Sequence, residues 1–72
     1  MSGRHETLLE MARRRVSEGV IRLARQEEIV AELNRGSYPE AADLGRAVLE
    51  TMRSSLVLWE YRLRAIEERS KS

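Results

Sequence analysis

Apolar residues recur every seven positions in two long segments of the chain, and this spacing predicts two helices. In the first segment Leu9, Val16, Leu23 and Val30 form one series, and the intervening positions hold Ala12, Gly19, Gln26 and Leu33. Residues three and four apart share one face of a helix. The pattern therefore predicts a helix over about residues 6–34 with a continuous apolar seam.

The second segment repeats the pattern over about residues 39–69. Its two series are Ala42, Leu49, Leu56 and Leu63, and Gly45, Met52, Trp59 and Ile66. Each helix would be about 45 Å long at 1.5 Å per residue. Further apolar residues lie beside the seams, so both apolar stripes are wider than a two-stranded coil needs. These are Leu8, Val20, Ile29, Val48, Val57 and Leu58.

The break between the helices falls at about residues 34–38. Gly36 is expected to take the left-handed conformation that ends a helix. Ser37 and Glu40 have the spacing of a capping box, and Pro39 would lie in the first turn of the second helix. A turn this short makes the helices antiparallel neighbours. The fold expected for residues 1–72 is therefore a single all-α domain, an antiparallel two-helix hairpin.

A chain of 72 residues is too short to bury a large core by itself. It has no cysteine, and its single histidine, His5, cannot form a metal site alone. We therefore expect stabilisation by self-association, with two hairpins pairing into a homodimeric four-helix bundle. The residues expected at this oligomer interface are Leu9, Val16, Val20, Leu23, Val30, Leu49, Met52, Leu56, Trp59, Leu63 and Ile66.

Four seam residues interrupt the regular pattern of aliphatic side chains. Gln26 either fixes the register of the helices as a buried amide or sits at an edge where its amide reaches water. Gly19 and Gly45 favour a close approach of the helices over a kink or a pocket. Gly45 is expected near Gln26 or Leu23. Trp59 is expected to pack in the core, with the anchoring of a partner as its alternative role.

The charged residues are balanced, with 13 basic and 12 acidic side chains and a net charge of +1. Five arginines on the first helix suggest a phosphate-binding stripe, but nearby acids favour a solvated face with salt bridges. These arginines are Arg13, Arg14, Arg15, Arg22 and Arg25. No apolar run reaches the roughly 20 residues that span a bilayer, and no secretory signal is evident. We expect a cytoplasmic protein without membrane contact.

Catalytic chemistry has no support in this sequence. There is no cysteine, no nucleophile-elbow motif and no glycine-rich phosphate loop. The acidic residues near the turn have no histidine beside them, so they read as a surface cluster and not as a di-metal site. We expect no enzymatic activity and no cofactor. The acidic residues in question are Glu27, Glu28, Glu32, Glu40 and Asp43.

The run V-S-E-G-V-I-R-L-A-R-Q-E-E-I-V-A-E-L, residues 16–33, resembles small helical proteins of alphaproteobacteria that have no assigned activity. The matching positions are Val16, Glu18, Gly19, Ala24, Arg25, Gln26, Ile29, Val30, Leu33 and Gly36. In the second helix Leu49 and Leu56 match, whereas the family more often has Phe at Met52 and His at Trp59. The turn departs from the D-G-H-D-T-like run of that family. The resemblance implies a shared helical pattern and no particular function.

Three functions remain open at this point. The first is a bacterial protein-interaction module that associates with itself through the apolar seam. The second is a nucleic-acid accessory protein that uses the five arginines. The third is a small subunit that docks its apolar stripe on a helix of a larger protein.

Overall fold

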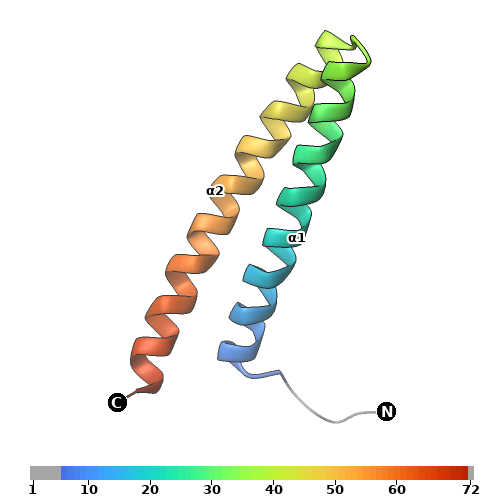
Figure 1. Ribbon diagram of the computed structural model, residues 1–72. Coiled ribbons are helices and arrows are strands. Elements are labelled where there is room, and N and C mark those ends of the chain that lie inside the picture. The colour runs from blue at the N-terminus through green and yellow to red at the C-terminus, as the bar shows by residue number, and fades with distance from the viewer. Residues whose placement is uncertain (1–5, 72) are drawn as a thin grey trace.

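Two long antiparallel helices lie side by side in the computed structural model, which describes residues 6–71 (Figure 1). Helix α1 spans Leu8–Arg35 and helix α2 spans Pro39–Ser70. The turn joins them at one end of the molecule, and the start of α1 and the end of α2 lie at the other. The hairpin predicted from the sequence is confirmed, with helix bounds within two residues of those expected. His5 lies outside the described residues.

Helix α1 begins with a capping box that the sequence analysis missed. The Thr7 hydroxyl accepts a hydrogen bond from the Glu10 N–H at 3.1 Å, and the Glu10 carboxylate accepts one from the Thr7 N–H at 3.0 Å. Each bond satisfies an amide that has no partner within the helix. The Thr-x-x-Glu spacing before the apolar series was the available signal, and it sets the start of the helix at Leu8.

The turn reverses at Ser37, so the prediction of a left-handed Gly36 is wrong. Ser37 has φ 61°, whereas Gly36 has φ −82°. The Tyr38 N–H donates to the Leu33 carbonyl at 3.0 Å, and the Ser37 N–H donates to the Asn34 carbonyl at 3.3 Å. This is the Schellman pattern with serine in the position that glycine usually takes.

Gly36 provides space in this turn and does not use the backbone freedom of glycine. A Cβ at Gly36 would lie 2.8 Å from Cε2 and 3.0 Å from Cδ2 of Tyr38. Its N–H continues the helical pattern by donating to the Glu32 carbonyl at 2.9 Å. The absent side chain therefore lets the Tyr38 ring fold back over the end of α1.

The expected capping box of Ser37 and Glu40 is also wrong. The residue that precedes α2 is Tyr38, and it makes no side-chain capping hydrogen bond. Ser37 takes the left-handed conformation one residue earlier, which removes its hydroxyl from the N-cap position. Pro39 is the first residue of α2, as predicted, because its fixed φ suits a helix start and its missing N–H loses no bond there.

The seams of the two helices face each other, and every seam residue of both helices is buried or half-buried. The most deeply buried part is built from small side chains. Ala12 and Ala42 are fully buried, and Val30 and Leu49 are each 7% exposed. The hydrophobic core of the hairpin is therefore thin. A large set of apolar and aromatic side chains remains exposed: Leu8, Val20, Ile21, Ile29, Tyr38, Leu44, Val48, Val57, Leu58 and Tyr61.

Candidate interaction surface

The helices approach each other closely at two glycines, as the sequence predicted. A Cβ at Gly19 would lie 3.0 Å from Cδ1 of Leu56, and a Cβ at Gly45 would lie 3.0 Å from Cγ2 of Val30. Both separations are shorter than ordinary van der Waals contact. The two glycines do not oppose each other, because Gly19 packs on the middle of α2 while Gly45 packs near the turn end of α1.

Gln26 lies at the second of these approaches, beside Gly45. Its amide nitrogen donates to the Gly45 carbonyl oxygen at 3.0 Å, and the side chain is half-buried between the helices. Of the two roles left open for Gln26, the structure supports the internal one. A directed hydrogen bond at this point of an apolar seam favours one longitudinal register of the helices over its neighbours.

One long edge of the hairpin is held by charged and polar side chains, and we call it the charged edge. Arg53 donates to Glu27 across the helices at 3.3 Å and to Glu50 within α2 at 2.9 Å. Further along, Arg46 donates to Asn34 at 3.3 Å. At the open end Arg13 and Glu67 approach to 4.0 Å, so polar pairs join the helices at three points along this edge.

The opposite edge, which we call the aromatic edge, is organised around Trp59. The guanidinium groups of Arg15 and Arg62 lie 5.4 and 5.1 Å from the centre of its ring, one from each helix. Cations at these distances are attracted by the negative face of an indole. Because Trp59 is half-buried, it packs in the seam, as predicted, and also presents part of its surface at this edge.

The five arginines proposed as a phosphate-binding stripe are distributed over several parts of the surface. Arg13 points to the charged edge and Arg15 to the aromatic edge, where Arg22 lies beside it around Gly19. Arg14 is engaged by Glu6 at 2.9 Å and Glu18 at 3.3 Å. The Arg13–Arg15 run therefore does not form one basic face.

The contact between Arg14 and Glu6 also shifts the ionisation of both groups. Two nitrogens of the guanidinium donate to the two oxygens of the Glu6 carboxylate, each at 2.9 Å. These hydrogen bonds hold the pKa of Glu6 below its ordinary value of 4.5 and raise the pKa of Arg14. Glu6 lies before the first residue of α1, so the pair ties this segment to the helix.

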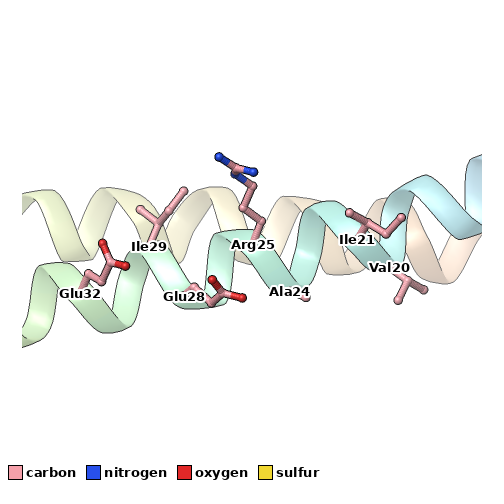
Figure 2. Close-up of a pocket in the computed structure, with 7 residues that line it drawn as sticks. All are labelled: Val20, Ile21, Ala24, Arg25, Glu28, Ile29 and Glu32. Atoms are coloured by element: carbon pink, nitrogen blue, oxygen red, sulfur yellow. The ribbon is translucent and has the colours of Figure 1, made fainter.

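The outer face of α1 is a mixed surface with a shallow hollow (Figure 2). Figure 2 shows Ile21, Arg25 and Ile29 along one line of the helix, with Val20 projecting in another direction. Ile21 is 66% exposed and Val20 is 50% exposed. The carboxylates of Glu28 and Glu32 line the same hollow, and they bring acidic charge next to Arg25. This face is therefore less apolar than its isoleucines suggest.

The residues expected at an oligomer interface fall into two groups. Val20 is exposed, whereas the others lie on the seam within one hairpin: Leu9, Val16, Leu23, Val30, Leu49, Met52, Leu56, Trp59, Leu63 and Ile66. Their contact with a second copy stays a prediction. Leu44 and Ile21, which are 69% and 66% exposed, were not predicted at an interface because both fall outside the seven-residue series.

Two further properties of residues 6–71 bear on the kind of site present. Neither helix contains a stretch long and apolar enough to cross a membrane. In this part of the chain, no three His, Asp or Glu side chains gather in an arrangement that would hold a metal ion.

Comparison with known proteins gave no relative. No family model, no curated protein and no solved structure matches this chain. The resemblance to small alphaproteobacterial proteins therefore stays an interpretation of the sequence.

Proposed function

We propose that this protein is a non-enzymatic interaction module that associates with itself as a homodimer of hairpins. The observation that carries the proposal is the imbalance between its thin core and its exposed apolar surface. Only Ala12 and Ala42 are fully buried among the described apolar residues, whereas Leu44 and Leu58 are 69% and 59% exposed.

The energetic reason is the small area that a two-helix hairpin removes from water. Burial of apolar surface contributes roughly 25 cal/mol per Å², so side chains that stay exposed contribute little to folding. Chains of this length bury only about 60% of their unfolded surface and are marginal as monomers. Pairing two hairpins into a four-helix bundle covers further apolar surface and raises the stability of both.

Light scattering coupled to size-exclusion chromatography tests this proposal on the purified chain. The expected mass is twice the 8.3 kDa of one chain, with dissociation on dilution. A protein that keeps the mass of one chain at every concentration from micromolar to millimolar would contradict the proposal. Circular dichroism on the same samples shows whether helix is lost when the dimer dissociates.

The two alternative functions predict different results for the same purified protein. A subunit that docks its apolar stripe on a larger protein would stay monomeric and would be captured in a mixed complex. A nucleic-acid accessory protein would bind duplex DNA or RNA at low salt, with affinity falling as salt rises. Substitution of Arg22 and Arg25 by Gln would weaken that binding while leaving the oligomeric state of the protein unchanged.

A further inference from the structure

Helix α2 carries a second row of side chains at regular heptad spacing, in addition to its seam. Leu44, Val48, Thr51, Ser55 and Leu58 follow one another at intervals of four, three, four and three residues. We call this row the outer stripe. At 100° per residue it lies about a quarter turn around α2 from the seam. This angle is the one at which a helix of a four-helix bundle meets its second neighbour.

The outer stripe is exposed and uncharged. Leu44, Val48 and Leu58 are 69%, 40% and 59% exposed, and every residue of the row is solvent-accessible. The charged residues of this part of α2 lie elsewhere on the helix. Arg46 and Arg53 face the charged edge, where Arg53 pairs with Glu27. An uncharged row some 21 Å long, with leucine at both ends, is a surface suited to another helix.

The order of residues along the stripe makes it complementary to itself in the antiparallel direction. Leu44 and Leu58 are each seven residues from Thr51, so a two-fold axis near Thr51 brings Leu44 of one copy onto Leu58 of the other. The larger Val48 then meets the small serines Ser54 and Ser55. The Thr51 hydroxyl already donates to the Ala47 carbonyl at 3.2 Å, so contact at the axis leaves no donor unsatisfied.

The charges that flank the stripe select the same arrangement. Glu40 and Arg62 are each eleven residues from Thr51, and both are exposed. Antiparallel pairing about Thr51 therefore places Glu40 of each copy against Arg62 of the other, which gives two opposite-charge pairs. Parallel pairing in register would instead place Glu40 against Glu40 and Arg62 against Arg62, which like-charge repulsion disfavours.

Helix α1 offers no equivalent row on this side. Its positions there carry charges of both signs, because Arg15 and Arg22 lie with Glu18. Arg25 likewise lies with Glu32. These mixed charges interrupt the apolar positions of α1, whereas the outer stripe of α2 has no charged residue.

We infer that a second copy of this chain packs on the outer stripe, with the two α2 helices antiparallel about Thr51 and with Glu40 paired to Arg62 at both ends. This inference rests on the proposed self-association and specifies its surface and direction. It differs from an interface made by the seam residues, because those residues already pack within one hairpin.

Charge exchange at the ends of the stripe tests the direction of pairing. The single variants Glu40→Arg and Arg62→Glu each create two like-charge contacts, and each is expected to weaken dimerisation about tenfold in sedimentation equilibrium. The double variant restores opposite charges and should dimerise more tightly than either single variant. Single variants that dimerise like the wild type, or a double variant weaker than both, would overturn the register.

Cross-linking at the axis tests the same arrangement without depending on charge. The chain has no cysteine, so Thr51→Cys carries a unique thiol. A short bifunctional maleimide is expected to join two copies of Thr51→Cys into a covalent dimer. Ile21→Cys, on the outer face of α1, is the matched control and is expected to stay uncross-linked. Efficient cross-linking of Ile21→Cys with none at Thr51→Cys would overturn the inference.

Disruption of the apolar row completes the test. Leu44→Glu is expected to give a monomer that retains helix, whereas Ile21→Glu at 66% exposure is expected to leave the dimer intact. The wild-type chain could dimerise while Thr51→Cys does not cross-link and the charge variants dimerise like the wild type. That outcome would refute this surface and leave the proposed self-association intact. A wild-type chain that is monomeric throughout would refute both.

Discussion

The side-chain amide of Gln26 donates a hydrogen bond to the main-chain carbonyl of Gly45, 3.0 Å away across the seam of the hairpin. The absence of a side chain at Gly45 leaves room for Val30 beside this bond, because a Cβ there would lie 3.0 Å from Cγ2 of Val30. The two residues together define which turn of α1 rests on which turn of α2.

Replacement of Gln26 by Ala is expected to lower the free energy of unfolding by about 1 kcal/mol, because a half-buried hydrogen bond and its packing are lost. Thermal unfolding followed by circular dichroism measures the change. Wild type and variant must be compared at one protein concentration, since association makes the melting temperature concentration-dependent. Gln26→Leu separates the two contributions, since it restores apolar bulk without the hydrogen bond. An unchanged melting temperature in Gln26→Ala would show that the bond contributes nothing.

The two seam glycines are expected to respond to alanine in opposite directions. Alanine favours a helix over glycine by up to about 1 kcal/mol. At Gly19 the new Cβ meets Cδ1 of Leu56, the far end of a flexible and half-buried side chain that can move, so Gly19→Ala should stabilise the protein. At Gly45 it meets Cγ2 of Val30, which is stiff at χ1 and only 7% exposed. Gly45→Ala should therefore destabilise it.

Chemical unfolding of both glycine variants under the same conditions measures this difference. The order of stability expected is Gly19→Ala above wild type and wild type above Gly45→Ala. A Gly19→Ala variant less stable than the wild type would show that Leu56 does not move aside for the new methyl group. A Gly45→Ala variant more stable than the wild type would show that Val30 does.

Glycine at position 37 should stabilise the turn, and alanine at position 36 should destabilise it. Ser37→Gly relieves a positive φ and is expected to add about 1 kcal/mol to the stability of the hairpin. Gly36→Ala is expected to destabilise it, since the methyl group would lie 2.8 Å from the ring of Tyr38. The variant pair Gly36→Ala and Gly36→Ala/Tyr38→Ala shows whether the ring is the obstacle, and removal of the ring should recover part of the loss.

The pH dependence of the start of α1 follows from the pair of Glu6 and Arg14. The Arg14 hydrogen bonds lower the pKa of Glu6 in the folded protein, so the pair stabilises this segment above the ordinary carboxyl pKa of 4.5. That contribution is lost as the pH falls through the lower folded value. A carbon-detected NMR titration of the Glu6 carboxyl is expected to show a midpoint below 4.5. The midpoint should return toward 4.5 in Arg14→Gln, and an unchanged midpoint there would contradict the assigned cause.

The start of α1 illustrates a local feature that could be read from the sequence. The capping spacing of Thr7 and Glu10 lies within four residues and needs no tertiary contact, so it was predictable although it was missed. The conformation of the turn was harder to predict. The chain contains Gly36 and Ser37 side by side, and only the structure shows that Ser37 takes the left-handed conformation while Gly36 leaves space for the Tyr38 ring.

The candidate surface also has one part that the sequence predicts and one part that only the structure shows. The seam could be predicted because its residues repeat every seven positions, and a helix carries such residues to one face. Leu44 and Leu58 were not linked to each other because the outer stripe contains Thr51 and Ser55 at positions where the seam has aliphatic residues. Its importance depends on exposure, and exposure is decided only when the seam is covered by the other helix.

The sequence by itself determined that this protein forms two long helices with one apolar face each, because helix periodicity and turn chemistry are local properties of the chain. The tertiary structure decided that Gln26 meets Gly45 and that Arg15 and Arg62 both approach the Trp59 ring. It also decided that cross-helix ion pairs gather at one edge of the hairpin while the other edge is organised around Trp59. These relationships join residues far apart in the chain, and their geometry depends on the register at which the two seams interlock.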